Sequence, residues 1–590
     1  MHRTLTFLGR TFAITTVIAM VTTALVGFVG LSPAVARDPG PLAAWETPTL
    51  AKIHVAPPPP GSVYVANGGS DSNAGTLAQP FATIHHALAV VAAGGTVTVR
   101  GGTYRESLGA IKHKVTLQAY PGEQPWVKGS VVVAPSAFTS NGGAWSTPFT
   151  TKMCDNCFPA GALDPLYPAA GYPEQVFVDG APLRQVLNKD VLGPGAFYVD
   201  RSAGQLWLND DPTGHTIEVT ELASAFTISP AAAGTVIRGL GFEHWATVYQ
   251  NGTNVAGASS APNVTFDGDT FAWSATRALG IYGNNDVVTN SKFLNNGMNG
   301  LLVNAVSGFD IENSEIAYSN WEHFSIASTP FAQIAGLKCT SCSNTMIRRD
   351  NFHDSLSNAL WFDRLSYNQT VVYNQVIHNE GHGITIEVSA NSIIAENVVA
   401  NNGRDGIKIS GANVVEVWNN TSVGNGGAEI GVYEDPRHTT PPPPPTSDTT
   451  SVRIGNNIFE DDGSSTTYVF DSLDATHPPH ETTLQMISAD DHNDFGRTNP
   501  TDPLYTFATQ ASLSKSGHYL TDKDYYLVSG RERSSSITDG IPLSVLFTDP
   551  STNNYTVQPA SALLLAQPAT MPSPVAQALG TGTTPNHIGA

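Results

Sequence analysis

The sequence predicts an all-β fold in which short strands stack as the successive coils of a solenoid. Four asparagines stand 23 residues apart along the chain: Asn351, Asn374, Asn397 and Asn420. The segments around them share short apolar strands joined by Asn/Gly turns, and a constant interval of about 20–50 residues is typical of stacked repeats. Only 13% of the residues are charged and 54 are Gly, a composition that suits turn-rich β structure.

The register of the repeat also indicates where the solenoid is interrupted. It continues backwards to Asn313 and Asn290, and it breaks across residues 321–338 and again at the proline run 441–445. We expect loops at both breaks, and loops on a rigid scaffold are where functional sites tend to be built. The asparagines themselves are expected to hydrogen-bond the backbone of neighbouring coils and one another, which is a structural role.

The first 36 residues have the pattern of a secretory signal peptide. Basic residues precede an apolar run over 11–31, and Ala34-Val35-Ala36 offers a cleavage site. We therefore expect a secreted protein, with the cell envelope as the alternative if the signal stays uncleaved. No later run of 18 apolar residues exists, so no membrane span is expected after cleavage. Residues 37–60, which end in four prolines, are interpreted as a linker.

The order of the remaining elements follows from local patterns. A strand at 63–66, an amphipathic helix at about 81–91 and a strand at 96–99 open the mature chain. A helix ahead of the first coil would cover its open apolar end, which a solenoid requires. Residues 61–124 are therefore assigned to the N-terminal cap and the first coils.

The later part of the chain divides into three regions. Residues 125–225 alternate strands with tight turns and lack the coil period, so we predict an inserted antiparallel β region. Regular coils are expected over 226–465, followed by degenerate coils and a C-terminal cap over 466–590.

Charge and cysteine content restrict the partners and the compartment. The net charge of −21 argues against nucleic acid and anionic membrane surfaces as partners. The four cysteines form two Cys-x-x-Cys pairs, Cys154 with Cys157 and Cys339 with Cys342. Two such pairs can hold zinc, but in an exported chain disulfides are the favoured interpretation, and their connectivity stays open.

Several segments resemble those of a known superfamily. The opening DSNAGT, QPFATI and GGTYRE and the closing HIGA are similar to segments of secreted right-handed parallel β-helix proteins of the pectate-lyase-like superfamily. This resemblance covers most of residues 61–590. It implies a right-handed parallel β-helix, a carbohydrate substrate, and a last coil closed by HIGA.

Alignment of the strand that precedes each asparagine strand brings two acids into register. Leu360 and Phe362 are apolar and match Ile384 and Ile386 of the next coil, so the residues between them must face outward. Asp363 and Glu387 then occupy equivalent places on consecutive coils, about 4.7–4.9 Å apart. A retaining glycosidase needs two carboxyl groups about 5–5.5 Å apart. The alternative is that both are ordinary exposed acids.

Residues around this pair are candidates for substrate contacts: Trp361, Lys338, Lys408, His382, His323 and Glu322. Alternation places Trp361 and the two lysines on the outward face, where a sugar ring can stack on an indole. Lys338 is favoured as the charge partner of Asp363, with a catalytic base as the alternative. His382 lies in a turn at the mouth of this face, and Glu322 and His323 lie in the first interrupting loop.

The segment LWFD, followed 24 residues later by TIE, resembles one group of β-helix β-xylosidases. In that group an Asp and a Glu from consecutive coils serve as nucleophile and acid/base. The resemblance implies the role of nucleophile for Asp363 and of acid/base for Glu387.

Three functions remain in competition. The first is a monomeric, secreted retaining glycoside hydrolase that cleaves a polysaccharide or its oligosaccharides and requires no cofactor or metal. The second is a polysaccharide lyase or uronate C5-epimerase, in which Lys338, Lys408 or Arg364 supplies positive charge, or Asp363 and Glu387 hold Ca²⁺. The third is a non-catalytic carbohydrate-binding solenoid, because the fold by itself does not imply an enzyme.

Overall fold

The computed structural model describes residues 45–151, 153–154, 158, 163–249, 255–325, 333–435, 448–463, 468–472, 482–501, 504–508, 517–519, 521–561, 563, 567–585 and 587–590. The expected signal peptide and the proline run 441–445 therefore lie outside the described residues. No described helix combines the length and the apolar character that a membrane crossing needs.

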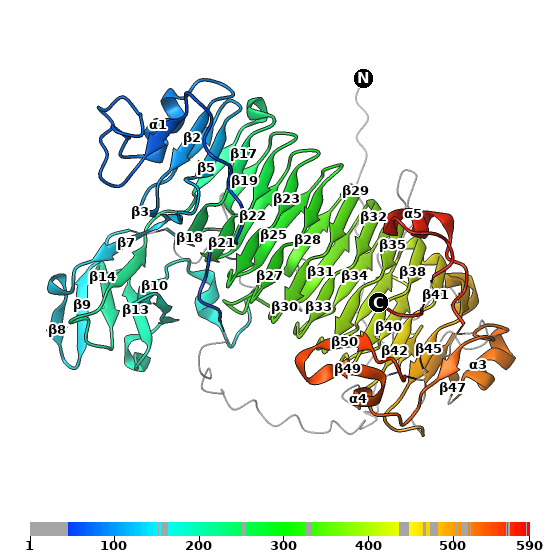
Figure 1. Cartoon of the computed structure of the whole chain (residues 1–590). Helices are drawn as coiled ribbons and strands as arrows, with labels where there is room; N and C mark the ends of the chain where they lie inside the picture. Colours follow the sequence, from blue (N-terminus) through cyan, green and yellow to red (C-terminus); the bar gives the residue numbers. More distant parts are fainter. Residues whose placement is uncertain are drawn as a thin grey trace, which may run out of the picture. The chain divides into compact units, whose positions relative to one another are not determined.

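Three sheets of thirteen strands each form the stack of coils. Figure 1 shows these coils following one another along the stack. Each regular coil contributes one strand to each sheet, in the order sheet I, sheet II, sheet III. The strands pair in parallel across successive coils, except that the last two strands of sheet I are antiparallel. The predicted all-β solenoid is confirmed.

Sheet I consists of β4 (Gly109–Ile111), β16 (Phe226–Ile228), β19 (Val255–Ser259), β22 (Arg277–Ile281), β25 (Asn299–Asn304), β28 (Ala335–Thr340), β31 (Asn358–Asp363), β34 (Ile384–Glu387), β37 (Ile407–Ser410), β40 (Ile430–Tyr433), β43 (Phe470–Asp471), β46 (Tyr505–Phe507) and β47 (Gly517–Tyr519). Sheet II consists of β1 (Val63–Val65), β2 (Thr96–Val99), β5 (Thr116–Ala119), β17 (Val236–Arg238), β20 (Thr265–Asp267), β23 (Val287–Thr289), β26 (Asp310–Glu312), β29 (Ser343–Arg348), β32 (Ser366–Val372), β35 (Ser389–Ala395), β38 (Asn413–Trp418), β41 (Thr450–Gly455) and β44 (Ile487–Asp491). Sheet III consists of β3 (Gly102–Tyr104), β6 (Pro125–Lys128), β18 (Gly241–Trp245), β21 (Thr270–Ser274), β24 (Lys292–Leu294), β27 (Glu315–Ala317), β30 (Asn351–His353), β33 (Gln375–Ile377), β36 (Val398–Ala400), β39 (Thr421–Val423), β42 (Ile458–Glu460), β45 (Asp494–Gly496) and β48 (Ser536–Ile537).

The interior of the coils is a continuous apolar core. Leu360 and Phe362 of β31, with Ile384 and Ile386 of β34, are fully buried, as the alternation along these strands predicts. Burying a large apolar side chain contributes about 1.5–3 kcal/mol. The core therefore holds the strands of sheet I in a register that leaves the intervening side chains on the outer face.

A ladder of asparagines stacks at the turns between sheets II and III. Asn374 donates from Nδ2 to Oδ1 of Asn397 at 2.9 Å, and Asn397 donates in the same way to Asn420 at 2.9 Å. Asn351 does not belong to this ladder, contrary to the prediction, because Asp350 occupies the equivalent place and its amide donates to Oδ1 of Asn374. This coil is one residue longer, so the 23-residue spacing to Asn351 is accidental.

Asn313 and Asn290 also stand outside the ladder, contrary to the prediction. The amide of Ser314 donates to Asp350 at 2.7 Å, and the amide of Ser291 donates to Oγ of Ser314 at 3.1 Å. Asn313 and Asn290 stand one position before these serines, with φ values of 53° and 51°. They take the left-handed conformation that each turn requires, which asparagine tolerates well.

The N-terminal helix α1 (Ile84–Val90) begins three residues later than predicted. Thr83 is extended and its side chain accepts a hydrogen bond from the amide of His86, which makes it the N-cap. Ile84, Ala87 and Leu88 are buried and join the core of the first coils. The predicted capping helix is thus present at the start of the stack.

Residues 45–56 are packed against the coils, so the prediction of a linker over 37–60 is wrong for this part. The amide of Glu46 donates to Oδ1 of Asn295 at 3.2 Å, and Leu50 and Val55 are 6% and 7% exposed. A Cβ atom on Gly268 would lie 2.4 Å from Cδ1 of Ile53, which is too close for any residue other than glycine. Apolar side chains that fit against glycines hold this segment in place.

The inserted region contains two sheets. The first has the order β11 (Ala181–Pro182), β10 (Val176–Val178), β15 (Ile217–Thr220) and β7 (Ser130–Val133), and the second has the order β12 (Arg184–Val186), β13 (Ala196–Asp200), β14 (Gln205–Leu208), β9 (Ala144–Pro148) and β8 (Thr139–Asn141). All pairs are antiparallel except β12 with β13. The expectation of an antiparallel region is confirmed, although β6 pairs with β3 and β18 and belongs to the coils.

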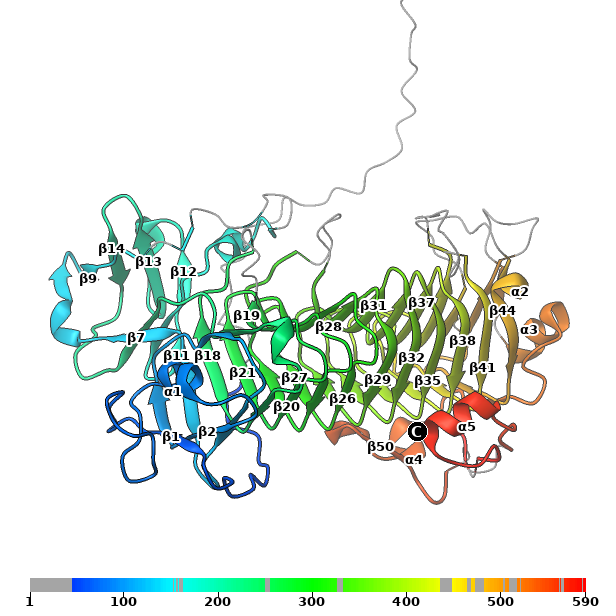
Figure 2. The same cartoon turned by 90° about the horizontal axis from the view of Figure 1, so that it is seen from above.

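The C-terminal region carries α2 (Thr483–Met486), α3 (Asp522–Ser529), α4 (Leu543–Leu546), the hairpin β49 (Phe547–Asp549) with β50 (Asn554–Val557), and α5 (Ser573–Leu579). From α4 onward the chain runs back along the flank of the coils, where α5 lies beside β35 (Figure 2). The closing HIGA does not complete a coil, contrary to the resemblance, because the amide of Ala590 donates to Thr421 at 2.9 Å.

The described cysteines are disulfide-bonded. Cys339 and Cys342 form a disulfide with each other, and Cys154 is also disulfide-bonded. Cys157 lies outside the described residues. The disulfide interpretation therefore replaces the zinc alternative for the pair at 339 and 342.

Candidate active site

Two rows of outward side chains cross sheet I. The central row contains Leu302, Lys338, Trp361, Thr385, Lys408 and Gly431. The acid row contains Asn304, Thr340, Asp363, Glu387, Ser410 and Tyr433. Within the acid row, the amide of Arg364 donates to the carbonyl of Glu387 at 3.2 Å, so the pairing of Phe362 with Ile386 continues to the two acids.

Asp363 is the last residue of β31 and meets Lys338 of β28. Nζ of Lys338 lies 2.9 Å from Oδ2 of Asp363. The side chain of Lys338 is only 2% exposed and that of Asp363 is 12% exposed, so solvent screens this ion pair weakly. A lysine is therefore the charge partner of Asp363, as the sequence favours.

Glu387 ends β34, accepts a hydrogen bond from Trp361 and forms an ion pair with Lys408. The indole Nε1 of Trp361 donates to its Oε2 at 3.0 Å, and Nζ of Lys408 lies 3.9 Å from its Oε1. Each acid thus has its own nitrogen partners. The two carboxylates stand on neighbouring strands, whose spacing is about 4.7–4.9 Å.

Trp361 is placed differently from the expectation that a sugar stacks on it. Nζ of Lys338 lies 3.0 Å from the centroid of its ring, and the residue is 9% exposed. A cation over the face of an indole is a favourable arrangement. A sugar ring therefore cannot stack on the face of the Trp361 indole that Lys338 covers. The N–H edge of this indole is directed to Glu387.

The central row is buried more deeply than the prediction of an open outward face suggests. Lys338 and Thr385 are each 2% exposed, because neighbouring side chains of the row pack along one another. Oγ1 of Thr385 is buried and has no hydrogen-bond partner among the residues that the structure describes. Leaving a buried hydroxyl unpaired costs about 1–3 kcal/mol.

His382 precedes β34 and lies against Asp405 of the next coil. Its Nδ1 is 3.3 Å from Oδ2 of Asp405, and burial lowers the pKa of His382. Burial opposes ionisation of Asp405 as well, but the contact with His382 outweighs it and lowers the pKa of Asp405. Asp405 also accepts a hydrogen bond from the amide of Ala428 at 3.0 Å.

Glu322 and His323 have their partners in the inserted region. Gln175 donates to Glu322 at 3.4 Å, and burial raises the pKa of Glu322 to about 7. The ring of His323 stacks on that of Tyr167 with centroids 4.0 Å apart, and burial lowers the pKa of His323. These two candidates join the first interrupting loop to the insertion; their described partners are neither Asp363 nor Glu387.

Sequence reasoning missed the end of the acid row. Tyr433 follows Ser410 in the register of sheet I, and its hydroxyl lies 3.5 Å from Oδ2 of Asp471. The signal was present in the sequence, because Ser410 and Tyr433 are also 23 residues apart. The strand IGVY carries Gly431 at the central position, where IKIS carries Lys408.

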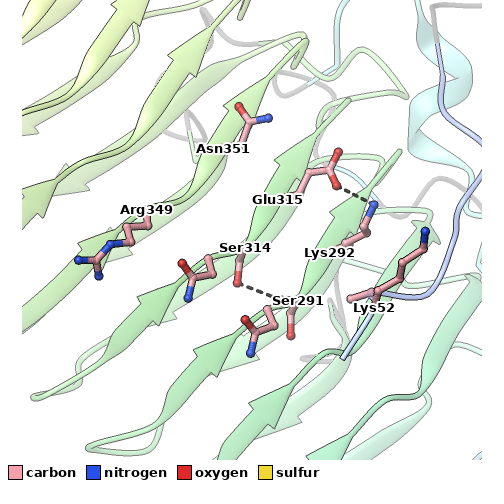
Figure 3. A pocket seen from close by; sticks show the side chains of 10 residues that line it. Lys52, Ser291, Lys292, Ser314, Glu315, Arg349 and Asn351 are labelled. Carbon is pink, nitrogen blue, oxygen red and sulfur yellow. Dashed lines mark hydrogen bonds and ion pairs between the residues drawn. The ribbon is translucent and has the colours of Figure 1, made fainter. Parts of the chain in front are cut away.

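A groove of about 490 Å³ lies beside the strands of sheet III, whereas the two acids belong to sheet I. Figure 3 shows side chains that line this groove. Residues of three coils and the segment at Lys52 line it. Its acidic lining residue, Glu315, is 2.8 Å from Lys292. The hydrogen bond from His353, aided by Lys292 and opposed by burial, lowers the pKa of Glu315 to about 2. An acid held ionised in this way cannot act as a proton donor near neutral pH.

Across the described part of the chain, no three or more His, Cys, Asp or Glu side chains gather in a way that would hold a metal ion. Asp363 and Glu387 themselves do not fit a Ca²⁺ site as they stand, because Lys338 and Lys408 lie against them.

Two family models match parts of the chain. One is described as a right handed beta helix region and matches residues 251–422. The other describes a protein of unknown function (DUF1565) and matches residues 67–118. The first includes both acids and confirms the predicted right-handed parallel β-helix.

Two curated relatives match short stretches. Uncharacterized protein YwoF of Bacillus subtilis (strain 168) is 41% identical over 76 residues, 12% of this chain and 16% of that protein. A mannuronan C5-epimerase of Pseudomonas putida (strain KT2440) is 30% identical over 91 residues, 15% of this chain and 17% of that protein. The chain thus spans less than a fifth of either relative.

One solved structure is similar over most of its length. XylC, determined in complex with xylose, superimposes with a TM-score of 0.59 at 16% sequence identity, over 74% of this chain and 83% of XylC. This likeness shows a shared fold.

Proposed function

We propose that the protein is a secreted, retaining glycoside hydrolase that cleaves a polysaccharide or its oligosaccharides. The observation that carries this proposal is the pair of acids at equivalent places on β31 and β34, each with its own nitrogen partners. Adjacent strands provide a separation close to the 5–5.5 Å that a retaining mechanism uses. The likeness to XylC, solved with xylose, makes xylo-oligosaccharides the first substrates to test.

In the first step Asp363 acts as the nucleophile. One carboxylate oxygen of Asp363 forms a bond to the anomeric carbon while the bond to the leaving oxygen breaks, and protonated Glu387 transfers its proton to that oxygen. Lys338 holds the carboxylate of Asp363 at 2.9 Å and fixes its orientation before substrate arrives.

In the second step Glu387 acts as the base. Its carboxylate takes a proton from water, the water oxygen bonds to the anomeric carbon, and the ester bond to Asp363 breaks. The free sugar keeps the anomeric configuration of the substrate, and Glu387 is again protonated.

Aryl glycosides with strong and weak leaving groups test the two roles separately. Asp363→Ala should lose activity on both kinds of substrate. Glu387→Ala should lose activity with poor leaving groups but retain bond cleavage with dinitrophenyl glycosides, which need no protonation, and added azide should yield a glycosyl azide of retained configuration. Full activity of both variants on every glycoside that the native protein cleaves would overturn the proposal.

A second candidate is a uronate C5-epimerase or polysaccharide lyase. The 91-residue match to a mannuronan C5-epimerase favours it, and Lys338 and Lys408 could neutralise a uronate carboxylate. Alginate and pectate screened beside neutral oligosaccharides discriminate the two functions. A lyase releases an unsaturated product that absorbs in the ultraviolet, an epimerase changes uronate composition without new reducing ends, and a hydrolase gives new reducing ends alone.

We also propose that the enzyme is an extracellular monomer, that it needs neither a cofactor nor a metal, and that its partner is its carbohydrate substrate. Activity in the culture medium, an unchanged rate in EDTA and a monomeric elution volume are the expected results.

A further inference from the structure

Trp361 contacts Glu387 directly and also contacts Lys338, the partner of Asp363. Lys338, which binds Asp363 at 2.9 Å, has its Nζ 3.0 Å from the centre of the indole ring. The edge of the same ring donates from Nε1 to Glu387 at 3.0 Å. The indole of Trp361 thus contacts both the Nζ atom that binds Asp363 and the carboxylate of Glu387.

The register of sheet I explains this position. Trp361 is paired with Lys338 of β28 on one side and with Thr385 of β34 on the other. Asp363 lies two residues further along the same strand, so both side chains face outward. The indole is 9% exposed and has two χ angles, so its orientation is set by packing and is not free to adapt to a ligand.

We infer that Trp361 is a positioning residue that orients Glu387 through its indole N–H and Lys338 through its ring, so that the two carboxylates keep a fixed relation. This inference deepens the proposed hydrolase function and depends on it for its catalytic meaning. The contacts themselves do not depend on that function, so they can be tested separately.

Substitutions separate the two contacts of the indole. Trp361→Phe keeps an aromatic face for Lys338 but removes the N–H that favours the ionised form of Glu387. The basic limb of the kcat/KM profile should then move to higher pH by about one unit. Activity on aryl glycosides with poor leaving groups should fall about tenfold in kcat/KM, while kcat/KM for dinitrophenyl glycosides, which reports a first step that needs no protonation, should stay near the native value.

Trp361→Leu removes both contacts. It should reduce kcat/KM for dinitrophenyl glycosides as well, because Lys338 then loses the ring that helps to hold it against Asp363. The chain offers a matched control in Trp418 of β38, whose Nε1 donates to Glu416 at 2.7 Å with Arg453 over its ring. Trp418→Phe should leave the pH profile and both rates unchanged.

A spectroscopic test needs no substrate. In protein labelled with ¹⁵N-tryptophan, the nine tryptophans give nine indole N–H signals, and the one lost in Trp361→Phe belongs to Trp361. We expect that signal to move with pH as Glu387 titrates, and to lose this movement in Glu387→Gln. The indole signal of Trp418 should behave identically in the native protein and in Glu387→Gln.

The outcomes distinguish the inference from the function on which it rests. A Trp361 signal that titrates identically with and without Glu387, or a pH profile of Trp361→Phe equal to that of the native enzyme, would overturn the positioning role. If the signal follows Glu387 but Asp363→Ala and Glu387→Ala remain fully active, the positioning contact stands and the hydrolase proposal fails. Thermal unfolding of each variant shows whether it is folded, and the indole titration in native protein still decides if a variant is not.

Discussion

Burial inside the coils changes the pKa of the side chain of Glu429. It stands just before β40, is 1% exposed, and accepts hydrogen bonds from the amide of Asn425 at 2.9 Å and from Oγ of Ser422 at 2.7 Å. These donors favour the ionised form, but burial outweighs them and raises the pKa of Glu429 to about 8. The residue is therefore protonated in the folded protein at neutral pH, although it would be ionised in the unfolded chain.

This difference predicts a pH dependence of stability. Because the folded-state pKa is raised above the unfolded value, the contribution of Glu429 is fully present at pH values below its ordinary value of 4.5 and is lost as the pH rises to about 8. For this group the free energy of unfolding falls by about 1.4 kcal/mol per pH unit over that window. Glu429→Gln should reduce the decline of the thermal midpoint between pH 5 and 8.

The control for this measurement is Glu380→Gln. Glu380 is exposed, so its replacement should leave the slope of thermal midpoint against pH as it is in the native protein. Other buried acids, such as Glu460, have pKa values raised by burial and contribute a slope of the same sign. Equal slopes in the native protein and in Glu429→Gln would contradict the prediction.

At the scale of elements, the turns between sheets II and III depend on side chains that replace missing backbone partners. Asn397 is fully buried, accepts from the amide and Nδ2 of Asn374 at 3.0 and 2.9 Å, and donates to the carbonyl of Val371 at 2.9 Å and to Asn420. Each turn is thereby bonded to the turns before and after it. A continuous ladder of this kind maintains the register between the strands of consecutive coils, including β31 and β34.

Removal of one ladder member should be costly. Asn397→Ala leaves several buried donors and acceptors without partners, at about 1–3 kcal/mol each, so we expect a loss of about 3 kcal/mol or more in the free energy of unfolding. Hydrogen exchange should increase in β32, β35 and β38 around the missing side chain.

Asn141→Ala provides the comparison for the ladder. Asn141 is exposed in β8, and its replacement should change the free energy of unfolding by no more than about 0.5 kcal/mol. Similar thermal midpoints for the two variants would show that the ladder contributes little.

At the scale of the whole molecule, the described segments 45–56 and 587–590 lie along the coils. The N-terminal segment packs at Asn295, and the C-terminal segment returns to Thr421. The returning segment buries Val575 and Leu579 against Val372 and Trp418 of sheet II. It therefore covers apolar side chains that the regular coil pattern leaves on the outside.

Loss of this cover should expose an apolar surface. Val575→Asp, at a position that is fully buried in α5, should lower the thermal midpoint and promote self-association, because a charge is placed against the coils. A chain ending at residue 540 should show the same two effects more strongly.

Val545→Asp is the matched control, since Val545 lies in α4 of the same segment and is 52% exposed. It should leave the midpoint and the elution volume near the native values. If Val575→Asp behaves like Val545→Asp, the returning segment does not protect the coils.

The sequence by itself determined the solenoid and the neighbouring places of Asp363 and Glu387. Both follow from a strict repeat, since side chains alternate along a strand and the apolar core permits one register. The charge partnership of Lys338 with Asp363 was also predictable, because the two lie on consecutive strands.

Only the tertiary structure decided the roles of the surrounding groups. The direction of the Trp361 indole depends on how Lys338 and Glu387 pack on either side of it, and no spacing in the sequence encodes that angle. The one-residue difference that places Asp350 instead of Asn351 in the ladder arises from the length of one coil. The partners of Glu322 belong to an insertion more than a hundred residues away, a contact that only folding in three dimensions creates.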